Sequence, residues 1–477
     1  MKPADVLKQF GFNMLPFADA ASTGLPLGRL LRLSLFQVSV GMATVLLLGT
    51  LNRVMIVELS VPAMLVAAMV ALPVLVAPFR ALMGFRSDTY RSAIGWRRVP
   101  YIWFGSLYQF GGLAFMPFSL IVLSGDQTLG PEWAGEALAA AAFLMTGLGL
   151  HMTQTAGLAL AADQAEPDKR PRVVALLYVM FLAGMAGCAL IFGWLLRDFT
   201  ALRLIQVVQG AAVVTLALNL VALWKQERMA PMTRAERAAP RPAFADAFVD
   251  LAGQPGLLRM IVVIALGTAA FAMQDVLLEP YGGEILGMSV AATTTLTAAW
   301  ALSALVGFGL AARWLSRGRD PFRIAAHGAL VGIFAFSAVV FAAPLGSTVL
   351  FFVGAGLIGL GSGLFAVAML TAIMNVPRRG LADTGLALGA WGAAQATATG
   401  LAIAAGGAIR DVVGSVAMTG AFGEGLATPF VGYSFVYHLE IGLLFLTIIA
   451  IGPLVRVGPV RTPPRGADAF GLSEFPT

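Results

Sequence analysis

Twelve long apolar runs constrain the fold of this chain more than any other feature of its sequence. Each run is long enough to cross a bilayer as a helix, which takes roughly 18 to 25 apolar residues. Ala, Leu, Gly and Met dominate the runs, and no alternating pattern of about ten residues recurs, which favours helices over a membrane barrel. The predicted spans are 33–52, 62–83, 101–123, 136–160, 173–196, 203–224, 259–278, 286–312, 324–343, 347–374, 384–409 and 432–455.

The composition excludes a water-soluble protein of this length. Hydrophobic residues make up 58% of the 477 residues and charged residues only 12%, whereas a soluble domain carries about 25% charged residues. The single cysteine, Cys188, excludes a disulfide scaffold and a cysteine-rich zinc site, and three histidines exclude most histidine-built metal centres. We therefore expect an all-α integral membrane protein with no catalytic and no metal site.

Basic residues are distributed very unevenly over the predicted loops. Of the 31 lysine and arginine residues, all but Arg53, Arg197, Arg203 and Arg410 fall on one side of the membrane. Because basic loops stay in the cytoplasm, both termini are expected there. A net charge of +6 fits a cytoplasmic face that rests on anionic lipid, and it requires no nucleic acid.

A long polar segment rich in Pro, Ala, Arg and Glu separates six predicted spans from another six. Six spans, a cytoplasmic linker and six more spans are the plan of the major facilitator superfamily, which is the predicted fold. The expected organisation is an N-terminal segment 1–32, a first half 33–224, a linker 225–258, a second half 259–455 and a tail 456–477.

The loop between spans 2 and 3 carries a sequence similar to the facilitator motif G-x-x-x-D-(R/K)-x-G-(R/K)-(R/K). Its residues are Gly84, Asp88, Gly95, Arg97 and Arg98, with an insertion between the aspartate and the second glycine. Such a motif packs glycine-bearing helix ends closely while its aspartate pairs with an arginine or a helix N-terminus. The alternative is a solvated basic loop.

Few ionisable residues are expected deep in the bundle. Predicted spans 2, 3, 5, 6, 8, 10 and 11 carry none in their apolar middle, and His151 in span 4 is the deep candidate. Glu58, His438 and Glu440 are placed at the outer ends of their spans. Because ionisable groups at mid-depth are costly and mark ion pathways, a midsection without them suits a large hydrophobic ligand better than a hydrated one.

Polar residues gather where predicted spans 1 and 7 reach the outer side. Asn52 and Arg53 end span 1, and Gln274, Asp275 and Glu279 end span 7. Because facilitator topology brings these two spans together, the residues are expected to form a polar mouth or gate. An ion pair of Arg53 with Asp275 or Glu279 is one expectation, and separately solvated charges are the other.

His151 lies in the glycine-rich segment 147–157, whose small residues would let another helix or a flat macrocycle approach. A neutral imidazole there could ligate the magnesium of such a macrocycle, with Gln154 as a hydrogen-bond partner. His438 is the second candidate for cofactor binding. The alternatives are a hydrogen bond from His151 to a neighbouring helix and an ordinary interfacial histidine at position 438.

Several stretches of the sequence resemble the PucC/LhaA family of purple phototrophic bacteria. They are spread over most of the chain, at 30–41, 51–58, 78–90, 95–104, around His151 and at 273–283. That family is a pigment-linked offshoot of the major facilitators, associated with assembling light-harvesting antenna complexes and thought to deliver bacteriochlorophyll.

The resemblance implies a non-enzymatic assembly factor in the photosynthetic inner membrane. It would bind bacteriochlorophyll a, with a carotenoid as a second candidate ligand, and pass pigment to the antenna α and β polypeptides. The resemblance favours the core antenna (LH1) over the peripheral antenna (LH2). Bacteriochlorophyll synthase and the membrane insertion machinery are candidate partners of the basic loops. The alternative function is a secondary transporter of a lipophilic solute.

Overall fold

The computed structural model of the chain describes residues 20–21, 25–75, 95–96, 98–124, 131, 133–166, 169–227, 256–374 and 384–455. Every regular element in these residues is helical. Eleven helical segments among them are long and apolar enough to cross a membrane. The predicted all-α membrane fold is therefore confirmed.

The first half begins with a crossing from Leu27 to Glu58. It contains α2 (Leu27–Leu33), α3 (Leu35–Val45) and α4 (Leu51–Arg53), with π-helical turns before and after α4. The other helices of this half are α5 (Ala63–Leu75), α7 (Val99–Leu123), α8 (Ala134–Gln164), α9 (Arg170–Leu195) and α10 (Ala201–Leu223).

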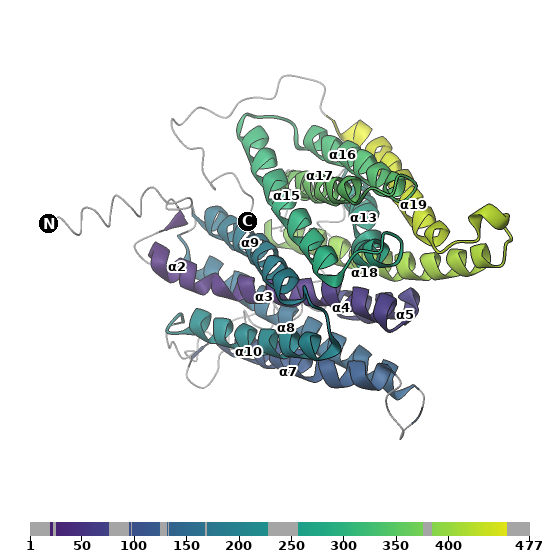
Figure 1. Ribbon diagram of the computed structural model, residues 1–477. Coiled ribbons are helices and arrows are strands. Elements are labelled where there is room, and N and C mark those ends of the chain that lie inside the picture. The colour runs from purple at the N-terminus through teal and green to yellow at the C-terminus, as the bar shows by residue number, and fades with distance from the viewer. Residues whose placement is uncertain are drawn as a thin grey trace.

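The second half begins with a broken crossing. Helix α13 (Leu257–Ala272) gives way to a 3₁₀ turn, Met273–Val276, and the chain continues as α14 (Leu278–Glu284). The other helices of this half are α15 (Val290–Ser316), α16 (Pro321–Ala342), α17 (Thr348–Met374), α18 (Thr384–Met418) and α19 (Phe430–Ile451). Figure 1 shows the helices of the two halves as two groups lying side by side.

Helix α5 corresponds to predicted span 62–83, of which residues 76–83 lie outside the described part of the chain. Several crossings are longer than predicted, among them the first crossing and α18. The first ends at Glu58 rather than 52, and α18 ends at Met418 rather than 409. In both cases the extra turns contain an arginine paired with a nearby carboxylate, so the helix continues past a charge that would otherwise end the apolar span.

Glycines allow the closest helix contacts, and they do so at corresponding places in the two halves. A Cβ at Gly149 of α8 would lie 2.6 Å from the carbonyl oxygen of Gly105 in α7. A Cβ at Gly328 of α16 would lie 2.7 Å from the carbonyl oxygen of Gly361 in α17. Helix association in a membrane depends on such small-residue packing. The third and fourth helices of each half are thus joined in the same way.

The halves meet through α5 against α18 and through α9 against α15. At the first contact, a Cβ at Gly407 would lie 2.6 Å from the carbonyl oxygen of Ala63. At the second, a Cβ at Gly193 would lie 3.1 Å from the carbonyl oxygen of Ala291. The second and fifth helices of one half therefore contact the fifth and second helices of the other, which relates the halves by pseudo-two-fold symmetry.

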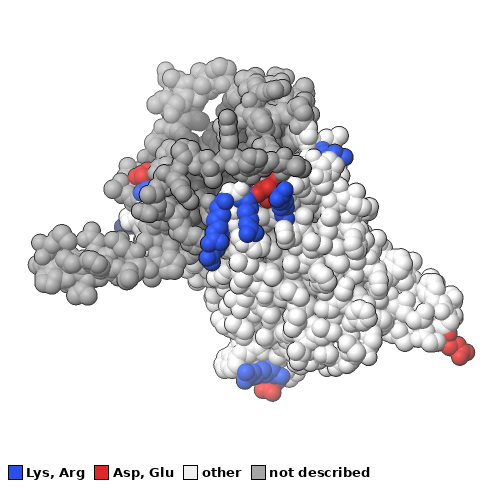
Figure 2. Space-filling view, turned by 90° about the horizontal axis from the view of Figure 1, so that it is seen from above, with Lys and Arg blue, Asp and Glu red and all other residues white. Residues whose placement is uncertain are grey.

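Residues other than Lys, Arg, Asp and Glu cover most of the face seen in Figure 2, and the charged side chains lie towards its edges. Large apolar side chains such as Phe104, Phe118, Phe334 and Ile449 are exposed on the exterior of the bundle. A surface of that kind is stable only in contact with lipid. The protein is a multi-pass membrane protein.

The bundle has two ends, which differ in the residues that lie there. The linker end is where α7 begins at Val99 and α10 ends at Leu223. The Arg410 end is the opposite one, where α14 ends at Glu284 and α18 ends at Met418.

Candidate functional site

The structure brings the first crossings of the two halves together near the Arg410 end, as predicted. The side-chain amide of Asn52 donates to the carbonyl oxygen of Asp275 at 3.4 Å, and the hydroxyls of Thr50 and Thr294 lie 3.2 Å apart. Asn52 is completely buried. The contact between the halves is therefore made by polar groups inside the protein and not by solvated charges.

Arg53 does not form the predicted ion pair with Asp275 or Glu279 in the described part of the chain. Its guanidinium pairs with Glu58 and donates to the carbonyl oxygen of Met288 at 3.1 Å. The π-helical turn Val54–Glu58 has a wider repeat than an α-helix, and it ends on the carboxylate that pairs with Arg53. Arg53 thus joins the halves through a backbone carbonyl.

Glu279 is buried and reaches across the interface between the halves. Its carboxylate accepts a hydrogen bond from the hydroxyl of Thr297 and contacts Gly49 of the first half. A Cβ at Gly49 would lie 3.1 Å from the carboxyl carbon of Glu279. Glycine at this position lets the carboxylate approach the first crossing.

A group of polar side chains lies deeper, where α13 stops. The carboxylate of Glu440 accepts a hydrogen bond from the backbone N–H of Gln274 at 2.8 Å, and the side-chain amide of Gln274 donates to Asp275 at 2.6 Å. Glu440 lies halfway along α19 and is completely buried, so its predicted place at the end of the span was wrong. The expectation of a nearly uncharged midsection fails at this residue.

The glycines near His151 are occupied by protein side chains and backbone. Gly157 packs against the ring of Phe36, Gly147 against Pro73, and Gly149 against α7. The small residues of this segment were predicted to let another helix or a flat macrocycle approach. In the described residues they let neighbouring helices approach. His151 and Gln154 themselves are half-buried on α8.

His438 lies on the opposite half from His151, on the exposed side of α19. Its Nδ1 is 2.6 Å from the carbonyl oxygen of Ser434. A carbonyl oxygen can only accept, so Nδ1 donates this hydrogen bond, and in a neutral imidazole Nε2 then carries the lone pair. This imidazole therefore has the tautomer of a metal ligand, with its other nitrogen fixed by a backbone carbonyl.

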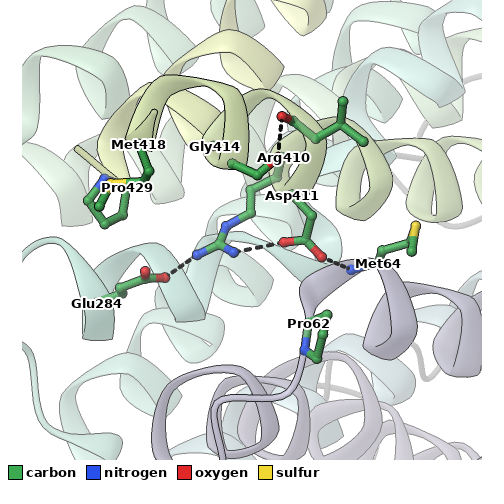
Figure 3. Close-up of a pocket in the computed structure, with 10 residues that line it drawn as sticks. Pro62, Met64, Glu284, Arg410, Asp411, Gly414, Met418 and Pro429 are labelled. Carbon is green, nitrogen blue, oxygen red and sulfur yellow. Dashed lines mark hydrogen bonds and ion pairs between the residues drawn. The ribbon is translucent and has the colours of Figure 1, made fainter. Parts of the chain in front are cut away.

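A charged cluster surrounds Arg410, and the sequence did not predict it. The distribution of basic residues only put Arg410 on the less basic side of the membrane. Figure 3 shows its guanidinium between the carboxylates of Glu284 and Asp411. The Tyr433 hydroxyl donates to Glu284 at 2.7 Å, and the guanidinium carbon lies 4.6 Å from the centre of the Tyr433 ring. The sequence feature that could have revealed this cluster is the adjacent pair Arg410–Asp411, which lies between two apolar stretches.

Asp411 connects this cluster to the other half. Its second carboxylate oxygen accepts a hydrogen bond from the backbone N–H of Met64 at 2.6 Å (Figure 3). Met64 lies in the first turn of α5, where backbone N–H groups have no helical partner and attract negative charge. The cluster borders a crevice of about 510 Å³ between the two halves. Asp411 thus fastens α18 to α5 at the Arg410 end.

At the linker end a second network holds the first half together. Arg98 is buried, and its guanidinium pairs with Asp163 at the end of α8 at 3.1 Å. Glu227 accepts hydrogen bonds from the backbone N–H groups of Arg98 and Val99, at 3.1 and 3.0 Å, and so caps α7. Glu227 thereby attaches the start of the linker to the N-terminus of α7.

Part of the predicted facilitator motif belongs to this network. Gly95 has a φ of 87°, a left-handed conformation that favours glycine, and it precedes the buried Arg98. Gly84, Asp88 and Arg97 lie outside the described residues.

Burial raises the pKa of Glu227 above its ordinary value of 4.5, although the N–H groups of Val99 and Arg98 oppose the shift. A carboxyl whose pKa is higher in the folded state holds its proton more tightly when folded. Its contribution to stability therefore falls as the pH rises from 4.5 through the raised pKa. Relative to Glu227→Gln, the wild-type protein is expected to lose thermal stability over that pH range. Melting temperatures of the two proteins in detergent, measured against pH, check this.

The matched control is Glu424→Gln, because Glu424 is exposed in the loop before α19. Its melting temperature should follow that of the wild type at every pH. Parallel profiles for wild type and Glu227→Gln would contradict the assignment.

Two halves of six helices, joined through α5–α18 and α9–α15 inside an apolar exterior, define a membrane protein of the major facilitator type. The chain belongs to the PUCC protein family, whose pattern matches residues 50–458.

Three relatives illustrate the range of similarity. The chain is 64% identical over 474 residues to the "Uncharacterized protein in puhA-bchM intergenic region" of Rhodobacter capsulatus, covering 99% of each chain. It is 51% identical over 450 residues to Protein PucC of the same organism, covering 93% of this chain and 96% of the relative. It is 28% identical over 393 residues to the "Bacteriochlorophyll synthase 44.5 kDa chain" of R. capsulatus, covering 81% and 88%.

Among solved structures, the chain resembles a bacterial homologue of the human lysosomal transporter Spinster in an inward-facing, unoccupied conformation. The TM-score is 0.64 at 14% identity, and the match covers 89% of this chain and 95% of that one. At this identity the similarity supports the fold alone.

Proposed function

We propose that this protein is an assembly factor for bacterial light-harvesting antenna complexes, which binds bacteriochlorophyll a and delivers it to the antenna α and β polypeptides. Membership of the PUCC family and 51% identity to a PucC protein support the antenna role. Identity is higher, at 64%, to the relative from the puhA-bchM region. We further propose that the chain belongs to a branch of the family apart from PucC and that its client is LH1 rather than LH2.

The observation that carries the pigment proposal is the imidazole of His438. It is exposed on a surface that faces lipid, and its Nδ1–H is held by the Ser434 carbonyl, so Nε2 presents a lone pair outward. Bacteriochlorophyll is a flat apolar disc with a hydrocarbon tail, and the His438 imidazole would hold it by supplying a nitrogen ligand to its magnesium ion. It can reach His438 sideways through the lipid without crossing a polar path. A carotenoid could lie along the same apolar surface.

His151 and Gln154 form a second, inner contact point for pigment. Both are half-buried in the middle of α8, and the glycines around them are already filled by neighbouring helices. A macrocycle therefore has less room there than beside His438. We assign initial capture to His438 and a later or weaker contact to His151.

We propose, on the positive-inside rule, that the linker end faces the cytoplasm, and that the membrane is the bacterial inner membrane. On that orientation the exposed Arg319 and Arg323 lie near the cytoplasmic surface, where they can contact bacteriochlorophyll synthase or the insertion machinery. Because no acid–base constellation is assigned to the chain, the proposed role is delivery without catalysis.

The proposal is tested by purifying the protein from a pigment-making host and recording near-infrared absorbance with the magnesium content. We expect a bound pigment band that is mostly lost in His438→Ala and reduced in His151→Ala. His327→Ala is the matched control. His327 is also exposed and has its Nδ1 2.6 Å from a helical carbonyl, but it lies at the linker end among arginines. Full pigment retention by His438→Ala would overturn the assignment of that residue.

A secondary transporter of a lipophilic solute is the second candidate. The major facilitator fold and the buried Glu279 and Glu440 favour it, since transporters of this fold use buried carboxylates for coupling. It predicts concentrative uptake into proteoliposomes that falls when Glu279 is changed to Gln. Pigment transfer to antenna polypeptides without any uptake would exclude it.

A further inference from the structure

The broken crossing of the second half creates an unusual polar interior. Helix α13 ends at Ala272, and the 3₁₀ turn Met273–Val276 follows before α14 begins. The break leaves the backbone N–H of Gln274 available to Glu440 instead of to its own helix. Discontinuous helices of this kind build the ion sites of membrane transporters, because their free backbone groups face inward.

Two carboxyl groups meet at this break without a basic partner. In the described part of the chain, no lysine, arginine or histidine forms an ion pair with Asp275 or Glu440. Arg53 is engaged by Glu58 and the Met288 carbonyl. Glu440 is completely buried and Asp275 is half-buried. A buried carboxylate with no counter-charge is strongly unfavourable, so something must neutralise Glu440.

Among the described residues, the broken crossing contributes Gln274 and Asp275 to the surroundings of Glu440. The ring of Tyr281, on α14, packs edge-on against Tyr437 of Glu440's own helix. Helix α16 contributes the apolar Phe336, which stacks on Tyr437 of Glu440's own helix. Arg410 of α18 is held by Glu284, Asp411 and Tyr433, and His438 points outward.

Several buried oxygen atoms in this region have no hydrogen-bond partner among the described residues. They are Glu440 Oε2, Gln274 Oε1, Tyr437 Oη and Asn52 Oδ1. Gln274 is 2% exposed, and Glu440, Tyr437 and Asn52 are 0% exposed. Gln274 bonds to both carboxyl residues, and Asn52 bonds to the backbone of Asp275. Buried polar atoms are normally satisfied, so the three acceptor oxygens of Glu440, Gln274 and Asn52 indicate a missing positively charged or donor species. The Tyr437 hydroxyl can itself donate a hydrogen bond.

We propose that Asp275, Gln274 and Glu440 form a buried site for a monovalent cation, a proton or Na⁺, with the Asn52 amide linking the site to the first half. All of its free atoms are oxygens, which are the ligands of hard cations. Only two acidic residues contribute, and the described residues contain no group of three His, Cys, Asp or Glu side chains, so a divalent metal is not the expected occupant.

The site is tested on the full-length protein in detergent by infrared spectroscopy and thermal unfolding. In sodium-free buffer at neutral pH, the proton arm predicts the carbonyl band of a protonated carboxylic acid, with a shift in D₂O. The sodium arm predicts a higher melting temperature in NaCl than in choline chloride of equal ionic strength. At least one of these signals is expected in the wild type.

Glu440→Gln keeps an oxygen to accept from the Gln274 N–H but removes the charge, and it should abolish whichever signal the wild type gives. Asp275→Asn should do the same and serves if Glu440→Gln does not fold. Glu424→Gln, in the exposed loop, should leave the signal unchanged. A wild-type protein with neither signal would overturn the proposal, and so would a signal that persists in both variants.

Discussion

Replacing Arg410 by leucine is expected to lower the free energy of unfolding by about 3 kcal/mol, at the lower end for breaking a buried ion pair. The guanidinium is 16% exposed and lies between Glu284 and Asp411, which are 28% and 18% exposed. Without it, two mostly buried carboxylates would be left without a positive partner. Thermal unfolding of the purified protein in detergent measures the loss.

The matched control is Arg197→Leu, because Arg197 is exposed at the same end of the bundle. That variant should unfold within about 0.5 kcal/mol of the wild type, as expected for a surface substitution. A double variant, Arg410→Leu with Glu284→Leu, should recover part of the lost stability, since one orphaned carboxylate is removed. Equal melting temperatures for Arg410→Leu and Arg197→Leu would show that the cluster contributes nothing.

The Arg410 variant should also loosen the connection between the halves. Asp411 is held by Arg410 on one side and accepts from the Met64 N–H on the other. When the guanidinium is absent, Asp411 is free to turn toward water. Amide exchange at the start of α5 should then quicken, and hydrogen-exchange mass spectrometry of that segment can detect it.

The fold could be predicted from the sequence because its signals are averages over long windows. Apolar run length and residue type define membrane helices, and errors of a few residues at the ends do not change the class. The meeting of Asn52 with the broken crossing followed from the same topology, which brings the first helix of each half together.

The charged clusters could not be predicted because a window average hides the direction in which a side chain points. Glu440 and His438 are two residues apart on α19, yet one is completely buried and the other is exposed. Helical rotation places them on different faces, and the packing of α13, α16 and α18 against α19 decides which face is inside. The charged cluster around Arg410 was not predicted for the same reason, because the sequence does not show which way its side chain points.

The predicted ion pair of Arg53 with Asp275 or Glu279 was wrong for a more local reason, the geometry of its own helix. The apolar run predicts a regular α-helix that ends near residue 52, which would leave Arg53 free to reach the other half. The crossing instead continues through a π-helical turn to Glu58, and that carboxylate takes the guanidinium. A change of helical repeat over five residues leaves no signature in composition.

Adding a single methyl group at Gly149 is expected to destabilise the protein by about 3 kcal/mol, at the upper end for an overpacked interior. The new Cβ would lie 2.6 Å from the Gly105 carbonyl oxygen and 2.8 Å from the Cα of Gln109. Both obstacles are backbone atoms of α7, so α7 and α8 would have to separate. Denaturation of Gly149→Ala in detergent measures the effect.

Gly210→Ala is the matched control, because Gly210 is also helical and a Cβ there meets nothing within 4 Å. Alanine is the better helix former, so this variant should be as stable as the wild type or slightly more stable. Gly328→Ala, at the corresponding contact of the second half, should be destabilised as Gly149→Ala is, since its Cβ would lie 2.7 Å from the Gly361 carbonyl oxygen. If only one of the two buried variants is destabilised, the two halves do not depend on the same helix contact, and their structural correspondence is not matched by an energetic one.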